Sequence, residues 1–303
     1  MSAWLPTAPC TPEDCVERPA ATVGTARRVL RAAGCAGVLL AGIGVGPVVR
    51  ALPRRVRERL VTAWARTLLA TLGVRVRALG SSVAVPGGLL VANHISWLDI
   101  AVIAAVCPGR NLAKTEVGRW PVLGPLVARS GTLFIDRDRL RSLPGTVARI
   151  AADLRRGERV VVFPEGSTWC GRAGGRFRPA LFQAAIDAGA PVQPVAVRYR
   201  SAGAPTTVPA FVGEDGLAFS LWRVLSLRGL VAEAVVLPPI PTDPPTGDDR
   251  LARRAPARRA LARRTLARAA QAAVDRERDG ARHCSVPARP PSVVPERRPA
   301  RMI

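Results

Sequence analysis

Short apolar runs alternate with stretches of helical periodicity between residues 74 and 237, and this alternation limits the chain to few folds. The runs at 89–92 and 159–163 are apolar throughout, as in strands that are buried on both faces of a sheet. Helical periodicity over 97–106 follows the first run, and helical periodicity over 143–156 precedes the second. Strands that alternate with helices form a sheet covered on both faces. The sequence therefore predicts an α/β fold with a central, mostly parallel or mixed sheet.

Further elements follow from the same periodicities. An edge strand is predicted at 74–78, because polar and apolar residues alternate there. The remaining predicted elements are strands at 111–114, 132–135, 192–199 and 231–237, and helices at 121–128, 178–188 and 219–227, with an irregular segment that contains a short strand at 204–214.

His94 and Asp99 lie where the strand at 89–92 turns into the helix at 97–106. Strand-to-helix turns are where α/β folds hold their chemistry. A carboxylate five residues after an imidazole can hydrogen-bond one ring nitrogen and leave the other as a base toward a hydroxyl. The alternative is that His94 has only a structural role, as a helix cap or in a polar gap, which is more common for a single histidine. The surrounding sequence has to decide between a catalytic and a structural role.

Four sequence blocks occur in a fixed order around this pair. The first is the His-x-x-x-x-Asp pattern behind Asn93, and the others are Gly-Thr-Leu-Phe-Ile-Asp-Arg at 131–137, Phe-Pro-Glu-Gly at 163–166 and Gln-Pro-Val at 193–195. Together they resemble the glycerolipid acyltransferase family over roughly residues 75–240. The resemblance implies an O-acyltransferase that uses a thioester donor, with 1-acylglycerol-3-phosphate as the expected acceptor. Acylation of another lysolipid, an aminolipid or a glycolipid, is the alternative within the same chemistry.

The resemblance implies that His94 removes the proton of the acceptor hydroxyl, which then attacks the thioester directly. Asp99 would fix the tautomer of the imidazole and stabilise the imidazolium. No covalent nucleophile is needed: residues 166–168 lack the Gly-x-Ser-x-Gly pattern of hydrolases, and nothing around Cys170 resembles an activating base. Ser96 is expected to cap the helix. Acyl-CoA or acyl-carrier protein would be the cosubstrate, with no bound cofactor.

Acceptor-binding residues are expected at three places. In the family, the arginine that closes the second block, Arg137 here, binds the acceptor phosphate, although as a surface ion pair with Asp136 it would contribute little. The third block, with Glu165, Gly166 and the helper hydroxyl of Ser167, is also assigned to the acceptor. Lys114 is the only lysine in the chain and is expected on phosphate.

Basic residues outnumber acidic ones by 45 to 22, which gives a formal net charge of +23. Such an excess favours a polyanionic partner, either nucleic acid or an anionic membrane surface. The sequence has no RNA-recognition signature and no zinc-finger spacing, so the membrane is the expected partner and no specific nucleic acid is expected. A non-catalytic membrane or nucleic-acid adaptor is the hypothesis from a different class.

Four regions are predicted along the chain. Residues 1–25 read as a flexible leader, 26–72 as membrane-associated helices, 73–245 as the acyltransferase domain, and 246–303 as a basic helical and disordered tail.

The membrane-associated region has two parts. An uncharged run at 32–49 lies between basic residues, at the lower limit of what spans a bilayer. An amphipathic stretch at 56–72 suits the headgroup boundary, or else packs on the core. The prediction is a protein on the cytoplasmic face of the cell membrane, held by a monotopic or single-span anchor.

The six cysteines are scattered without a Cys-x-x-Cys pair, and only His283 lies outside the motif as a further histidine. This pattern predicts neither a metal site nor a disulfide framework.

Overall fold

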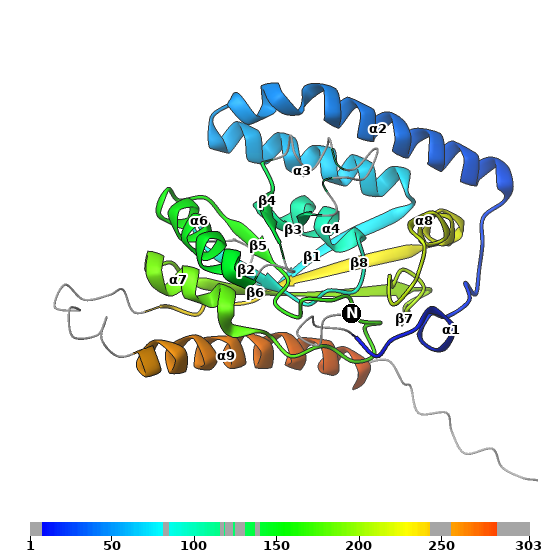
Figure 1. Ribbon diagram of the computed structural model, residues 1–303. Helices are drawn as coiled ribbons and strands as arrows, with labels where there is room; N and C mark the ends of the chain where they lie inside the picture. Colours follow the sequence, from blue (N-terminus) through cyan, green and yellow to red (C-terminus); the bar gives the residue numbers. More distant parts are fainter. Residues whose placement is uncertain are drawn as a thin grey trace, which may run out of the picture.

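The computed structural model describes residues 8–80, 85–115, 118, 124, 131–136, 140–242 and 256–283. Within them lies an eight-stranded sheet with the strand order β1-β8-β6-β2-β5-β3-β4, and β7 pairs with β6 (Figure 1). The strands are β1 Val74–Gly80, β2 Leu89–Ala92, β3 Arg110–Lys114, β4 Leu133–Ile135, β5 Val160–Val162, β6 Val192–Ser201, β7 Ala204–Pro205 and β8 Leu230–Val236.

The sheet is mixed, as the sequence predicts. Strand β2 runs parallel to both β5 and β6, β3 runs parallel to β4 and β5, and β1 runs parallel to β8. Only β8 and β7 are antiparallel to β6. The predicted edge position of β1 is confirmed. Because β2, β3, β5 and β6 are parallel, their carboxyl ends meet at one edge of the sheet, and the segments that follow them lie close together there.

Helices cover both faces of the sheet (Figure 1). Side chains of β2 alternate between the two faces: Leu90 and Ala92 belong to the core beneath α3 and α4, whereas Leu89 and Val91 belong to the core shared with α6, α7 and α9. The helices are α1 Pro12–Cys15, α2 Thr25–Ala51, α3 Arg54–Thr71, α4 Leu98–Val106, α6 Leu143–Arg155, α7 Phe182–Ala188, α8 Leu217–Ser226 and α9 Pro256–His283, with short 3₁₀ turns at Leu140–Ser142 and Pro179–Leu181.

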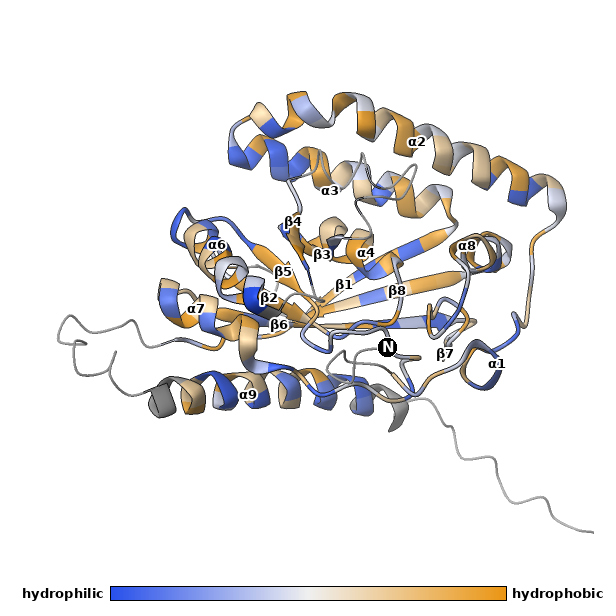
Figure 2. Ribbon diagram, viewed as in Figure 1, coloured by the Kyte–Doolittle hydropathy of each residue, from blue (hydrophilic) through white to orange (hydrophobic). Residues whose placement is uncertain are grey.

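Helices α2 and α3 form an antiparallel hairpin over α4 (Figure 1). Helix α2 is long and apolar enough to cross a membrane, and only 6% of its most apolar window is buried. Figure 2 shows it hydrophobic over most of its length. Helix α3 behaves differently, since Leu68 and Leu69 are buried in the core. This part of the predicted amphipathic helix therefore packs on protein, while Leu60 stays 43% exposed.

Two segments at the ends of the chain are more closely packed than the sequence suggests. Part of the predicted flexible leader lies against the domain, because Val23 is buried and its N–H donates to the carbonyl of Ser226. In the basic C-terminal region, α9 buries Leu266, Ala270 and Val274 against the sheet and α7. The predicted helix at 121–128 falls almost wholly outside the described residues, as does the chain after 283.

Candidate active site

The loop between β2 and α4 carries the His-x-x-x-x-Asp motif. Asn93 anchors its start: the side-chain amide donates to the carbonyl of Val197 at 2.9 Å, and the N–H of Val197 donates to Asn93 Oδ1 at 2.8 Å. Farther along, the N–H of Phe211 donates to the carbonyl of Ile95 at 2.9 Å. The loop is therefore held by main-chain partners on β6 and on the segment that follows β7.

His94 and Asp99 contact each other as the spacing predicts. Nδ1 of His94 lies 2.8 Å from Oδ2 of Asp99, which is fully buried in the first turn of α4. The same oxygen accepts the N–H groups of Ile95 at 2.7 Å and Ser96 at 2.9 Å. A carboxylate only accepts hydrogen bonds, so Nδ1 carries the proton toward it and Nε2 is left with its lone pair. The His94 side chain is 20% exposed.

Tyr199 completes the environment of Asp99. Its hydroxyl donates to Asp99 Oδ1 at 2.5 Å from the opposite side of the carboxylate. Burial and the neighbouring Asp99 raise the pKa of Tyr199 well above its ordinary value, so the phenol stays a donor. Sequence analysis missed this residue, although Tyr199 is the only tyrosine in the chain and lies in a predicted strand.

The imidazole is also held by an aromatic ring. Phe163, directly after β5, stacks on His94 with ring centroids 4.0 Å apart and an interplanar angle of 19°. The N–H of Trp169 donates to the carbonyl of His94 at 2.8 Å. Both contacts come from the third sequence block and the loop after it, which restricts rotation of the ring and of the peptide behind it.

Glu165 lies beneath the main chain of the motif and is only 3% exposed. Its Oε2 accepts the N–H of His94 at 2.9 Å, and its Oε1 accepts the N–H of Gly175 at 3.2 Å. Burial raises the pKa of Glu165 to about 8, against the opposing effects of these two N–H groups and of the Arg278 guanidinium. In this position Glu165 supports the peptide of His94, whereas sequence analysis assigned it to the acceptor.

Helix α9 reaches this site from the far end of the chain. Gln271 accepts the N–H of Phe177 at 3.0 Å and donates to the carbonyl of Gly175 at 3.3 Å. Gly174 leaves room for the Arg278 guanidinium, because a Cβ there would clash with it and come 3.0 Å from Glu165 Oε1. The basic C-terminal helix thus braces the loop that holds Glu165, a role with no signal in the local sequence.

The other predicted site residues are arranged as follows. Lys114 is exposed at the carboxyl end of β3, which β5 separates from β2, so it lies roughly 10 Å sideways from the His94 strand. Gly166 forms a turn with a φ of 75°, and its N–H donates to the carbonyl of Phe163. Ser167 is half-buried next to it. Arg137 lies outside the described residues.

Two further polar residues were singled out by the sequence. Ser96 is buried and its hydroxyl accepts the N–H of Leu98 at 3.3 Å, so it satisfies one N–H at the start of α4, although the N-cap position itself is Trp97. Gln193 of the fourth block is buried in β6, where its side chain donates to the carbonyl of Leu237 and accepts the N–H of Val85. These bonds give the fourth block a structural role in the sheet.

A basic groove lies where the carboxyl end of β6 meets the amino ends of β8 and β1. Its volume is about 430 Å³, and its charged lining consists of Arg75, Arg77, Arg200 and Arg228. The sequence predicts a polyanionic partner from net charge, and the structure gathers part of that charge in this groove.

Known proteins that are similar to this chain are acyltransferases. Residues 74–198 match the model of the family described as Acyltransferase. The chain is 37% identical over 242 residues to a lyso-ornithine lipid O-acyltransferase of Pseudomonas aeruginosa, covering 76% of this chain and 90% of the relative. It is 39% identical over 175 residues to a 1-acyl-sn-glycerol-3-phosphate acyltransferase of Neisseria gonorrhoeae, covering 57% of this chain and 69% of the relative.

A solved structure has the same fold. The 1-acyl-sn-glycerophosphate acyltransferase PlsC from Thermotoga maritima aligns over 81% of this chain and 95% of its own, with a TM-score of 0.54 and 18% sequence identity. At this identity the likeness establishes the fold alone.

Proposed function

Because this chain belongs to the acyltransferase family, we propose that it transfers a fatty acyl group from a thioester donor to the free hydroxyl of a lysophospholipid at a membrane surface. The observation that carries the proposal is the His94–Asp99 pair, with Nδ1 held by a buried carboxylate and the ring partly exposed. This is the arrangement that a general base toward a hydroxyl requires.

In the proposed reaction, Nε2 of His94 takes the proton of the acceptor hydroxyl while its oxygen bonds to the thioester carbonyl carbon. The tetrahedral intermediate then collapses, the carbon–sulfur bond breaks, and the leaving thiolate takes the proton back from the imidazolium. Asp99 stabilises that imidazolium. Tyr199, Phe163 and Glu165 are positioning residues, since they contact the pair or its backbone.

For the acceptor we propose 1-acylglycerol-3-phosphate. Its acylation would yield phosphatidate, so detection of that product would identify it. Lys114, Arg137 and the turn with Gly166 and Ser167 would bind its headgroup. Lys114 ends β3 and Gly166 lies after β5, and both strands belong to the parallel part of the sheet, so both residues lie at the carboxyl edge with His94. A guanidinium fork and an ammonium both suit a phosphate monoester.

A lyso-ornithine lipid is the second candidate acceptor. The observation that favours it is the extent of the match, since the Pseudomonas relative is covered over 90% of its length and the Neisseria relative over 69%. An ornithine headgroup carries no phosphate, so the two candidates predict different dependence on Lys114 and Arg137.

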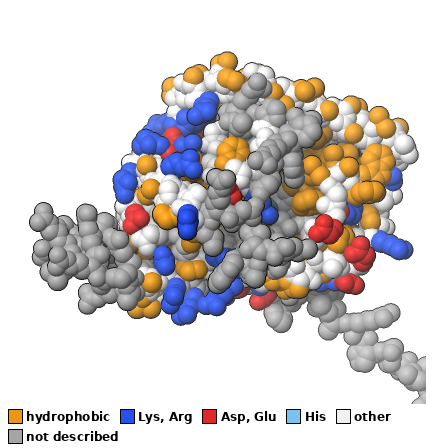
Figure 3. Space-filling model, viewed as in Figure 1, with side chains coloured by type: hydrophobic (Ala, Val, Ile, Leu, Met, Phe, Trp, Pro, Cys, Tyr) orange, Lys and Arg blue, Asp and Glu red, His pale blue; other side chains and the backbone are white. Residues whose placement is uncertain are grey.

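Exposed apolar side chains support docking on a membrane. They lie on α2 and α8, which contact each other, and Figure 3 shows hydrophobic side chains gathered along this side of the molecule. The exposed large apolar side chains of these two helices are Val29, Leu30, Leu40, Val45, Val48, Phe219 and Trp222. Arg28 lies over the Trp222 ring, with 5.7 Å from its Cζ to the ring centroid. A face that combines apolar side chains with arginines suits the headgroup boundary of an anionic leaflet.

The active site is near this face. Trp97, at the start of α4, donates its indole N–H to Ser220 of α8 at 3.1 Å, two residues before Trp222. An acceptor drawn from the bilayer would therefore have a short way to His94. We place the enzyme on the cytoplasmic face, where acyl-CoA and the acidic acyl-carrier protein are present, and the basic groove suits either donor.

The test is an acyl-transfer assay with full-length protein in mixed micelles. Acyl-CoA or acyl-carrier protein is supplied with lysophosphatidate, lyso-ornithine lipid or a lysoglycolipid, and products are identified by mass spectrometry. Free thiol that appears only when a lysolipid is added, together with an acylated product, supports the proposal. Thiol release that does not depend on acceptor, or no product with any acceptor, would overturn it.

A further inference from the structure

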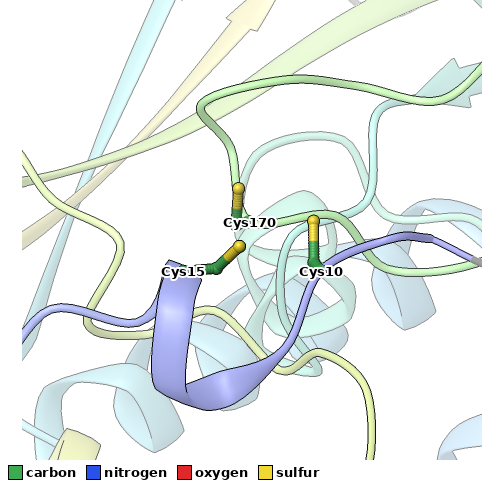
Figure 4. A group of neighbouring side chains, drawn as sticks. All are labelled: Cys10, Cys15 and Cys170. Atoms are coloured by element: carbon green, nitrogen blue, oxygen red, sulfur yellow. The ribbon is translucent and has the colours of Figure 1, made fainter.

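Three cysteines that are far apart in the sequence meet in the structure. Cys10 lies two residues before α1, Cys15 is the last residue of α1, and Cys170 lies in the loop after Glu165 (Figure 4). Their sulfur atoms all lie within 4.8 Å of one another. Cys10 and Cys170 are buried and Cys15 is half-buried, so Cys15 is the most exposed residue of the cluster.

The donor set is chemically uniform. Among the residues that the structure describes, the cluster contains three thiols and no carboxylate or imidazole. Thiolate ligands favour a soft, thiophilic cation over Mg²⁺ or Ca²⁺. Zinc binds thiolates at about 2.3 Å, which places tetrahedral ligand sulfurs roughly 3.8 Å apart. The separations here allow that geometry with small side-chain rotations, and a water can complete the coordination from the side of Cys15.

Neighbouring contacts hold the two segments together independently of the cysteines. Glu17 forms an ion pair with Arg172 at 3.0 Å, which links the N-terminal segment to the loop of Cys170. The N–H of Glu17 donates to the hydroxyl of Thr207 at 3.0 Å, and a carboxylate oxygen of Glu17 accepts the N–H of Thr207 at 3.3 Å. These contacts hold the backbone on either side of the thiols in place. Metal binding would therefore not have to bring the two segments together first.

We propose that Cys10, Cys15 and Cys170 bind one Zn²⁺ ion through three thiolates. Each thiol that coordinates releases its proton to solvent, and no oxidation is involved. The ion joins the N-terminal segment to the loop whose Trp169 N–H donates to the carbonyl of His94. Its role is structural: it holds this loop against the catalytic motif and takes no part in acyl transfer.

The experiment measures zinc on full-length protein, purified with a reductant and loaded with Zn²⁺ alone. Metal content is determined by mass spectrometry after removal of free ion, and Co²⁺ loading gives the absorption of tetrahedral thiolate coordination. The wild type is expected to hold one zinc per chain. Cys170→Ser and Cys15→Ser should each weaken binding about tenfold or more. Cys35→Ser is the matched control, because Cys35 is buried on α2 outside the cluster.

Several outcomes would overturn the proposal: equal zinc content in the wild type and Cys170→Ser, no zinc on protein whose thiols are reduced, or loss of two thiols to a disulfide with no bound ion. If Cys170→Ser fails to fold, half-buried Cys15 provides the deciding variant. Zinc should then raise the melting temperature of the wild type and of Cys35→Ser but not that of Cys15→Ser. These readouts are independent of acyl transfer, so the result stands whether or not the proposed function does.

Discussion

The hydroxyl of Tyr199 donates to Oδ1 of Asp99 at 2.5 Å, on the side of the carboxylate away from His94. The other oxygen, Oδ2, accepts from His94 Nδ1 and from two main-chain N–H groups. A buried carboxylate needs its hydrogen-bonding capacity filled, and here β6 and the motif's own loop fill it from opposite sides. The orientation of the imidazole therefore depends on a strand that lies a hundred residues farther along the chain.

Replacing Tyr199 with Phe should lower kcat about tenfold with little change in KM, because Asp99 would keep a buried, unsatisfied oxygen and hold the imidazole less firmly. The same loss should cost about 1–3 kcal/mol of stability. Steady-state kinetics and thermal unfolding of the same sample measure both effects. A drop in stability with unchanged kcat would show that Tyr199 serves only the fold.

His94→Ala should abolish most acyl transfer, because general-base catalysis contributes about 10²–10⁴-fold. The fold should persist, since the His94 main-chain bonds to Glu165 and Trp169 do not need the side chain. Product formation by mass spectrometry and circular dichroism check the two parts. Asp99→Asn should also lower the rate, because an amide no longer holds the His94 imidazole in the tautomer with its proton on Nδ1. Near-normal turnover of folded His94→Ala would contradict the mechanism.

Glu165 should make the stability of the protein fall as the pH rises. Its folded pKa of about 8 lies above the ordinary value of 4.5, so the folded state binds the proton more tightly than the unfolded state between these values. The stabilisation that Glu165 contributes through this proton is full below pH 4.5 and is lost as the pH rises to about 8. Glu165→Gln should remove this slope from the melting temperature measured across that range.

The matched control for Glu165 is Glu214→Gln, because Glu214 is exposed. It should keep the pH dependence of the wild type. If Glu165→Gln and the wild type lost stability in parallel as the pH rose, Glu165 would not be the group responsible.

Membrane attachment is best tested with point substitutions. Deleting residues 1–72 would test the sequence hypothesis directly, but it would also remove Leu68 and Leu69 from the core. Leu40→Glu and Phe219→Glu instead change side chains that are 65% and 78% exposed. Burial of a large apolar side chain contributes about 1.5–3 kcal/mol, so each should weaken binding to anionic vesicles about tenfold or more.

Co-sedimentation with vesicles measures this binding, and Leu261→Glu is the control. Leu261 is 63% exposed but lies on α9, across the sheet from α2 (Figure 1). If Leu261→Glu weakened binding as much as the α2 and α8 substitutions, the docking face would have to be assigned to α9.

The acceptor can be identified through Lys114 and Arg137. A charge-assisted hydrogen bond contributes roughly 1.5–3 kcal/mol, so Arg137→Ala should cost about one to two orders of magnitude in kcat/KM with lysophosphatidate. Lys114→Ala should lower the same quantity, and both losses should shrink with lyso-ornithine lipid. Arg264→Ala, at an exposed position on α9, is the control. Equal losses for both acceptors would favour the second candidate.

The sequence by itself determined the helices, strands and contacts that depend only on residues close together in the chain. Apolar runs and helical periodicity gave most strands and helices within a few residues, because side-chain alternation follows backbone geometry directly. The His94–Asp99 contact belongs here too, since the first turn of α4 brings two residues five apart into reach. Spacing therefore predicted the contact itself, whereas its proposed catalytic role came from the resemblance carried by the four sequence blocks.

Only the tertiary structure decided which distant residues support that pair. Tyr199, Gln271 and the cluster that joins Cys10 to Cys170 meet their partners through strand order and helix packing, which no periodicity within one segment encodes. The same holds for α9, whose composition predicts a helix but not the face of the sheet that it covers. Local sequence sets the backbone of each element, whereas burial and long-range hydrogen bonds arise only when all elements share one core.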